Sequence, residues 1–234
     1  MDFVLHQLND EEGWFKEKIS KSFVVKYKKN GSDACYLRME GVVDVPLFNI
    51  LTLIYEVDGH PEWIPFCSKG ERIKKLHRAA FAIKTKYSFP PPLAARECYM
   101  YGRGYDRLDR NGSVLLVCKS YDKNVKFLER FGIKMPEKQK GVKVDIHFIG
   151  TEIVPLGENQ IRLKISMCSN PHISFLPMSI LNWFNRKFAS MILGRLVKKA
   201  KKLGPVWEEK VQYNREFYDW LEIKVANFLK KLDG

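Results

Sequence analysis

The segment Phe81-Ala82-Ile83-Lys84-Thr85-Lys86-Tyr87 decides the fold class, because side chains of the same kind recur at every second position. In an extended chain Phe81, Ile83, Thr85 and Tyr87 lie on one face and the two lysines lie on the other. Such alternation predicts a β-strand with one buried face. The same period runs from about residue 68 to residue 170, which predicts a sheet of about six strands in this half of the chain.

The strands on either side of this segment are expected to pair as antiparallel hairpins. The expected pairs are about 95–107 with 113–121, turned at Asn111-Gly112, about 142–154 with 160–169, turned at Gly157-Glu158-Asn159, and Ser22–Lys29 with Cys35–Asp44, turned at Asn30-Gly31. Asn-Gly between two alternating segments is a strong hairpin signal, because both residues tolerate a positive φ.

The rest of the chain has helical spacing. We expect helices at 1–20, from Asp44 (as N-cap) to Asp58-Gly59, from Pro177 to about Leu203, and at about 206–232. The third of these carries a long apolar stripe of Leu181, Phe184, Phe188, Ile192 and Leu196, and Gly204-Pro205 should end it. Antiparallel strands followed by one long apolar helix predict an α+β fold in which this helix covers one face of the sheet.

The length of 234 residues fits one large domain. We predict a domain over residues 1–203, with its core at about 20–203. Residues 204–234 are predicted to form a helical extension that packs on this domain through its apolar stripe.

The chain is basic, with 40 Lys and Arg against 27 Asp and Glu and a net charge of +13. The densest basic cluster lies at the end of the helix after Pro177 and comprises Arg195, Lys198, Lys199, Lys201 and Lys202. These cations suit the negative end of a helix dipole, and they equally suit an anionic membrane surface. No nucleic-acid-binding motif accompanies the charge, so we expect no nucleic-acid partner.

The sequence contains no motif for covalent chemistry. It lacks a phosphate-binding loop, a dinucleotide fingerprint and a nucleophile elbow, and its five histidines and five cysteines lack metal-ligand spacing. We therefore expect no catalytic residues, no metal and no cofactor, and we expect reduced cysteines in the core. The N-terminus lacks a secretory signal and the longest apolar run, Phe48–Tyr55, is too short to span a bilayer, which predicts a cytosolic protein.

Three motifs resemble those of the StAR-related lipid transfer (START) domain, and within it the phosphatidylcholine transfer protein branch. They are Tyr87–Pro92 followed by Arg96-Glu97-Cys98-Tyr99, the segment Leu176-Pro177-Met178-Ser179-Ile180-Leu181-Asn182-Trp183, and the turn Trp63-Ile64-Pro65-Phe66. Their order and spacing agree over roughly residues 20–203. The helix from residue 206 onward is not part of the family core.

The resemblance implies a helix-grip fold, in which a curved antiparallel sheet is closed over a cavity for one lipid by the long C-terminal helix. It implies that Tyr87 and Arg96 contact a lipid phosphate, although Arg96 could instead form a structural ion pair with Glu97 or another neighbour. The remaining lipid-binding residues are expected to be Tyr101, His147, Met167, Met178, Leu181, Phe184 and Phe188. Of these, Met178, Phe184 and Phe188 lie where the family gate would be, and the loop 122–141 is a second gate candidate.

Phospholipid is the first expected ligand and sterol the second. The strand that carries the choline-selecting tryptophan in the family corresponds here to Val114–Cys118, so the resemblance predicts no particular head group. We expect a monomer that carries lipid between membranes and contacts anionic membrane surfaces transiently.

Two alternatives stay open. A helix-grip enzyme of the cyclase kind would need an acid or base in the cavity, for which Asp145, His147 and Glu152 are the candidates. A lipid sensor would instead use the final helix, Trp207 to Leu232, to bind a protein partner.

Overall fold

The computed structural model describes residues 2–18, 23–28, 34–121, 125–134, 141–173 and 178–232. Within these ranges the strands are β1 (Phe15–Lys18), β2 (Phe23–Lys28), β3 (Cys35–Val43), β4 (Cys67–His77), β5 (Ala80–Tyr87), β6 (Arg96–Arg107), β7 (Ser113–Ser120), β8 (Val142–Lys143), β9 (Asp145–Gly157) and β10 (Gln160–Asn170). The helices are α1 (Asp2–Asn9), α2 (Leu47–Tyr55), the 3₁₀ helix η1 (Val57–Glu62), α3 (Leu108–Asn111), α4 (Val125–Phe131), α5 (Met178–Lys201), α6 (Pro205–Tyr213) and α7 (Arg215–Leu232).

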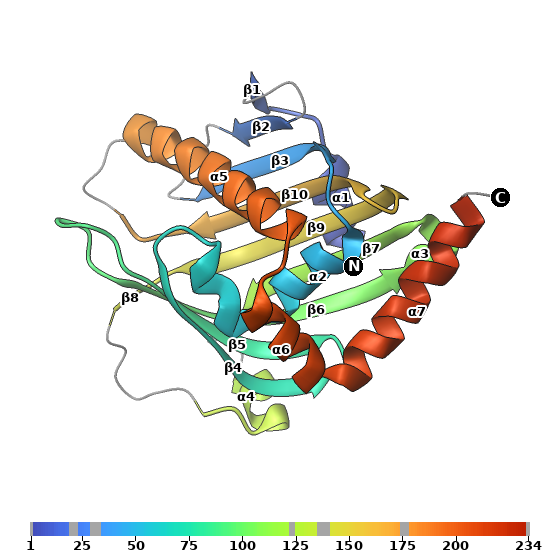
Figure 1. Cartoon of the computed structure of the whole chain (residues 1–234). Helices are drawn as coiled ribbons and strands as arrows, with labels where there is room; N and C mark the ends of the chain where they lie inside the picture. The colour runs from blue at the N-terminus through green and yellow to red at the C-terminus, as the bar shows by residue number, and fades with distance from the viewer. Residues whose placement is uncertain are drawn as a thin grey trace.

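All ten strands belong to one sheet, in the order β1-β2-β3-β10-β9-β7-β6-β5-β4. Neighbours along this order are antiparallel, and the two-residue β8 pairs with β6 in parallel. Helices α2 and α5 lie over one face of the sheet (Figure 1). The expected α+β, helix-grip fold class is confirmed.

The predicted alternation in β5 is also confirmed. Phe81 and Ile83 are buried on the face toward α2 and α5, and Thr85 follows them there. Lys84 lies on the opposite face, where its Nζ is 3.1 Å from Oε1 of Glu97 on β6. The opposite face is itself partly covered: Val4 and Leu8 of α1 pack on Leu115.

The predicted helix over residues 1–20 is wrong for residues 10–18, and residues 19 and 20 lie outside the described residues. Asp10 Oδ1 accepts a hydrogen bond from the backbone N–H of Glu12 (3.0 Å), and Gly13 has a φ of +71°, so the chain turns instead of continuing the helix. It then forms β1, in which Phe15 pairs with Tyr27 of β2 and stacks on its ring. Apolar residues at helical spacing thus serve a strand here.

The helix expected to begin at Asp44 has a different cap. Its N-cap is Pro46, without a side-chain cap, and Asp44 Oδ1 instead accepts a hydrogen bond from Gln160 Nε2 at 2.9 Å. Asp44 is two residues before the cap and cannot occupy the position from which a capping carboxylate reaches the first turn. The α-helix ends at Tyr55, and the expected stop at Asp58-Gly59 lies inside η1.

The single helix predicted for residues 206–232 is two helices, α6 and α7, which separate at Asn214. The Asn214 Nδ2 donates to Oε1 of Glu56 at 2.8 Å, so a tertiary contact holds the break. Trp207 of α6 and Tyr218 of α7 are fully buried. The contacts therefore join this segment closely to the rest of the molecule, while its status as a separate extension stays a prediction.

Of the expected turns, Gly157–Asn159 joins β9 to β10 as predicted, and Gly112 adopts a left-handed φ of +63° after the short helix α3. Asn30-Gly31 lies outside the described residues. Among the helices that the structure describes, none is long and apolar enough to cross a membrane.

Candidate functional site

The concave face of the sheet encloses an apolar cavity of about 290 Å³ beneath α5. Its floor comes from alternate residues of β3, β5, β6, β9 and β10, and its roof from Phe184, Phe188, Ile192 and Leu196 of α5. Alternate floor residues point inward because side chains alternate along a strand. The volume is close to the lower end of typical ligand sites, roughly 300–1,000 Å³.

Four aromatic rings gather at the end of this cavity that lies near the N-terminus of α5. Phe66, from the turn before β4, lies 5.1 Å from Phe89 and 6.4 Å from Phe184, and Phe184 lies 6.0 Å from Phe188, measured between ring centroids. Phe66 adopts a φ of +61°, a strained conformation for a residue with a side chain. The turn, the loop after β5 and the start of α5 therefore meet through these rings.

Arg96 is the charged residue in the cavity wall, and its side chain is buried. Its Nε donates to the carbonyl of Pro171 (3.1 Å) and its Nη1 to the carbonyl of Ala94 (2.6 Å). Within the described ranges no carboxylate lies at ion-pair distance from Arg96. Burial lowers the pKa of Arg96, but an arginine stays charged at neutral pH.

The alternative in which Arg96 pairs with Glu97 is wrong, because adjacent residues of β6 point to opposite faces of the sheet. Glu97 pairs with Lys84 and accepts a hydrogen bond from the Tyr99 hydroxyl (3.1 Å) on the outer face. Among the described residues, the Arg96 guanidinium thus has neutral carbonyl partners only. A buried charge of this kind favours an anionic group in the cavity, which would offset its desolvation.

Tyr87 lies directly opposite Arg96 in the β5–β6 register. Both residues line the cavity, and cross-strand neighbours on one face have Cβ atoms about 5 Å apart. Burial raises the pKa of the Tyr87 hydroxyl, which therefore stays protonated and can donate a hydrogen bond. The sequence prediction that these two residues act together agrees with their placement.

Of the other predicted residues, Met167, Phe184 and Phe188 line the cavity. Met178 and Leu181 belong to α5, but their side chains lie outside the described residues, as do Leu176 and Pro177 of the same motif.

Tyr101 and His147 do not line the cavity, which corrects the prediction for both. The inward residues of β6 have even numbers, such as Cys98 and Met100, so Tyr101 points to the outer face and packs near Tyr99. In β9 a register irregularity leaves both Ile146 and Ile149 facing inward, and His147 between them is exposed to solvent.

Sequence reasoning missed four polar residues of the cavity wall: His60, Thr85, Thr151 and Ser169. The inward position of Thr85 follows from the alternation of β5, but no sequence signal placed His60, which comes from η1. The His60 Nε2 lies 3.1 Å from the carbonyl of Ile54 and must donate to it, which makes Nδ1 the acceptor of the neutral ring.

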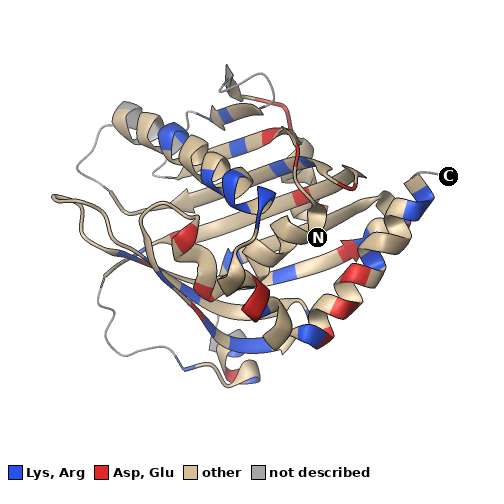
Figure 2. Cartoon of the chain, viewed as in Figure 1, with Lys and Arg blue, Asp and Glu red and all other residues tan. Residues whose placement is uncertain are grey.

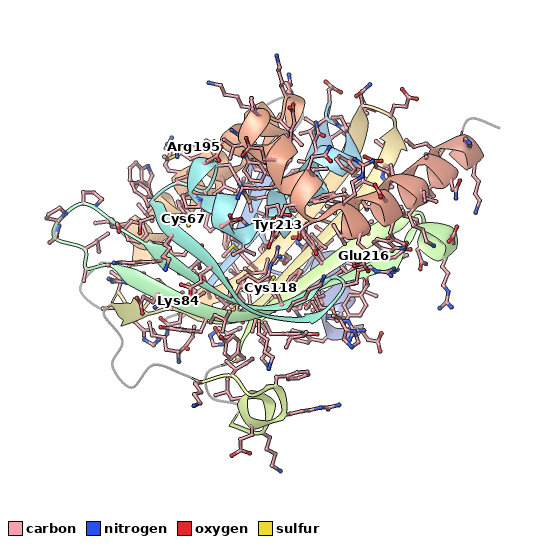
Figure 3. All side chains as sticks on the ribbon, turned by 60° about the horizontal axis from the view of Figure 1, so that its bottom comes forward. Cys67, Lys84, Cys118, Arg195, Tyr213 and Glu216 are labelled. Carbon is pink, nitrogen blue, oxygen red and sulfur yellow. The ribbon has the colours of Figure 1, made fainter. Side chains whose placement is uncertain are left out.

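The five cysteines are free, as expected. Cys98 and Cys118 face the cavity, and Cys118 is labelled on the sheet in Figure 3. Burial raises the pKa of Cys98 to about 12 and that of Cys118 to about 11, so both thiols stay protonated and unreactive at neutral pH. In the ranges that the structure describes, no group of His, Cys, Asp or Glu could hold a metal ion.

The prediction that loop 122–141 forms a second gate is wrong for residues 125–134. Leu128, Phe131 and Ile133 pack around Tyr99 on the outer face of the sheet, and Lys74 Nζ donates to the carbonyl of Phe131. Figure 3 shows α4 on the side of the sheet opposite to α5. This segment therefore cannot gate the cavity from where it lies.

The chain resembles solved lipid transfer domains in fold. Human STARD10 superposes with a TM-score of 0.73 at 18% identity over 96% of this chain and 86% of that chain. Human StAR-related lipid transfer protein 5 gives 0.69 at 15% identity over 86% and 92%. A STAR-related lipid transfer protein fragment from Xanthomonas axonopodis gives 0.65 at 15% identity over 82% and 100%.

The chain has the START fold. No protein-family profile matches the sequence, and no curated protein sequence matches it either. At these identities the START fold is established for this chain, and the phosphatidylcholine transfer branch that the motifs suggested stays a prediction.

Proposed function

We propose that this START-fold protein binds one phospholipid in the cavity beneath α5 and carries it between membranes. The observation that carries the proposal is the buried Arg96, which lies opposite Tyr87 in a mostly apolar wall and has no carboxylate partner among the described residues. A phosphodiester would accept hydrogen bonds from the planar guanidinium fork and from the tyrosine hydroxyl.

The apolar wall supplies the other part of the argument. Removing an acyl chain of about 16 carbons from a bilayer costs roughly 0.8 kcal/mol per CH₂, or about 12 kcal/mol in all. A cavity that excludes water can offset this cost, and the roof helix must move for lipid to enter. The aromatic cluster of Phe66, Phe89, Phe184 and Phe188 joins α5 to two loops, which makes that end the proposed gate.

The outer face of α5 is the proposed membrane contact. It exposes Ile180, Trp183 and Met191, and it exposes the basic residues Lys187, Arg195 and Lys198 on the same helix. Figure 2 shows blue residues along α5 toward its C-terminal end. Of the predicted basic cluster, Lys199 differs, because its Nζ lies 2.5 Å from Glu62 and so stabilises the fold.

Sterol is the second ligand candidate, since it would use the apolar wall without needing Arg96. The cyclase alternative receives no support from its three candidates: Asp145 pairs with His172, Glu152 pairs with Arg107, and with His147 all three lie outside the cavity wall. The sensor alternative is weakened because Phe217, Leu221, Val225 and Phe228 of α7 are buried within this chain.

The test is mass spectrometry of organic extracts from the purified protein, followed by transfer of labelled phospholipids between vesicles. We expect a co-purified phospholipid, and we expect Arg96→Leu to lower phospholipid transfer at least tenfold while sparing any sterol transfer. The matched control is Arg162→Leu, which removes the same charge from an exposed position of β10. Absence of bound lipid and of transfer for both phospholipids and sterols would contradict the proposal.

A further inference from the structure

A second, smaller cavity of about 160 Å³ lies at the other end of the concave face. Its floor includes Gly102 and Gly104 of β6 and Val114 of β7, and its roof is formed by Phe217, Trp220 and Leu221 of α7. This roof belongs to the C-terminal segment and not to α5. The two cavities therefore lie under different C-terminal helices, α5 and α7, although Ile54 of α2 and His60 of η1 line both.

The two cavities are neighbours that share part of their walls. Five residues line both of them: Ile54, His60, Ile83, Leu116 and Cys118. Along β6, Arg96, Cys98 and Met100 line the larger cavity, and the next inward positions, Gly102 and Gly104, line the smaller one. One continuous row of β6 residues thus runs from the arginine to the α7 roof.

The two glycines in the floor of the smaller cavity let neighbouring side chains lie against the β6 backbone. A Cβ at Gly102 would lie 3.2 Å from Cys118 Sγ, and one at Gly104 would lie 3.3 Å from Leu116 Cδ2, both closer than ordinary contact. Glycine in a strand interior is typical of such a close approach.

The smaller cavity differs from the larger one in charge. Of the charged residues at its edge, Lys224 Nζ lies 3.2 Å from the Asp106 carboxylate and Arg103 stacks over the Tyr105 ring. No buried guanidinium comparable to Arg96 lines it among the described residues. Since the described lining offers no unpaired buried charge to recognise an ion, this cavity suits an apolar group.

Side-chain contacts hold the α7 roof in place. The Tyr218 hydroxyl and Asn214 Nδ2 donate to the buried Glu56 carboxylate at 2.9 and 2.8 Å. Farther along α7, Lys224 and Lys231 both reach Asp109, at 3.2 and 2.9 Å. This end of the concave face is thus closed by contacts at both ends of α7.

The distance along β6 from Arg96 to the smaller cavity is close to the length of one phospholipid. At about 3.3 Å per residue, the six steps along β6 from Arg96 to Gly102 span about 20 Å, and the steps to Gly104 span about 26 Å. A phospholipid in a bilayer extends about 20–22 Å from its head group to its chain end, which is half the total thickness of roughly 40–45 Å. If the phosphate lies at Arg96, the methyl end of an extended acyl chain therefore lies at the start of the smaller cavity.

We propose that the smaller cavity under α7 receives the methyl end of a long acyl chain whose phosphate lies at Arg96. This rests on the proposed function and deepens it, because it makes the protein selective for chain length. Short chains end in the larger cavity, and methylenes beyond about 16 carbons gain burial only against Phe217, Trp220 and Leu221.

The direct test uses phosphatidylcholine with a diazirine near the methyl end of an 18-carbon chain. The loaded protein is irradiated, and the crosslinked peptides are mapped by mass spectrometry. We expect crosslinks in the α7 segment 217–224 and around Gly102–Gly104. Bound probe that crosslinks only to α5 and to β3 or β10 overturns this inference alone, whereas failure to bind such probes of any phospholipid head group contradicts the proposed function as well.

A variant pair provides a second readout. Val114→Phe places an aromatic ring in the smaller cavity, and Met167→Phe places one in the larger cavity. We expect Val114→Phe to lower binding of a 20-carbon relative to a 14-carbon phosphatidylcholine by about tenfold, the effect of roughly two methylenes. Met167→Phe should lower both alike. If Val114→Phe does not fold, Leu221→Phe on α7 tests the same space, and an unchanged chain-length ratio in the folded variant contradicts the inference.

Discussion

His60 is a buried ionisable residue between the two cavities. Burial lowers the pKa of His60 from 6.5 to about 4, because the folded protein does not solvate the imidazolium. Between pH 6.5 and pH 4 the unfolded chain therefore takes up a proton that the folded protein refuses. The stability that this neutral histidine contributes is complete above pH 6.5 and is lost as the pH falls toward 4.

We predict that the free energy of unfolding falls by about 3 kcal/mol from this group between pH 7 and pH 4. Urea denaturation at several pH values would measure it in the wild type and in His60→Gln, which cannot titrate. The raised pKa of the buried Glu56 acts with the opposite sign in both proteins, so their difference isolates His60. Equal pH dependence in the two proteins would show that His60 is not buried as described.

At the scale of elements, Trp207 anchors α6 on η1, and Lys210 of α6 also pairs with Asp58 of η1. Trp207 is fully buried, its Nε1 donates to Glu62 Oε2 at 2.9 Å, and a Cβ at Gly59 would lie 2.3 Å from its ring. The fit between this ring and a glycine explains why Gly59 lies within η1. Because α7 follows α6 directly, this contact also positions the roof of the smaller cavity.

Trp207→Ala should therefore lower the free energy of unfolding by about 3–5 kcal/mol, since it removes a large buried side chain and leaves a void. The control is Tyr213→Ala on the same helix, where the side chain is 89% exposed and the change should stay within about 0.5 kcal/mol. Thermal or urea denaturation measures both. A loss below about 1 kcal/mol for Trp207→Ala would mean that α6 does not stabilise the domain.

At the scale of the whole molecule, the net charge of +13 and the exposed face of α5 should act together. We predict binding to vesicles that contain anionic lipid, with each basic residue near the surface contributing about 1 kcal/mol at low salt. Raising the ionic strength from about 0.01 M to about 0.15 M should weaken binding strongly, because the Debye length falls from about 30 Å to about 8 Å.

Vesicle co-sedimentation would measure this salt dependence, and Trp183→Ser should weaken binding further, because its ring is 52% exposed on α5. Tyr213→Ser is the matched control on an exposed aromatic residue of α6. Equal binding to neutral and anionic vesicles would contradict the electrostatic part of this prediction. Sedimentation of the free protein would also test the expected monomer.

The sequence by itself determined the fold class and the approximate positions of most strands and of the long helix. Residues 81–87 show why: alternation along a strand is a local property, so the inward row of Phe81, Ile83, Thr85 and Tyr87 was readable before any contact was known. The family resemblance, and not the periodicity, named Tyr87 and Arg96, and the structure places them opposite each other on β5 and β6.

Only the tertiary structure decided what depends on distant partners. Phe15 lies in a strand because Tyr27 is beside it, and the C-terminal segment divides at Asn214 because Glu56 lies within reach. The register irregularity in β9 turned His147 outward, and the alternation of β6 placed Tyr101 on the outer face, away from the cavity. Two further features were not predictable for the same reason: within the described residues Arg96 has no carboxylate beside it, and a cavity lies under α7. Burial and charge pairing depend on contacts between elements far apart in the chain, about which sequence periodicity carries no information.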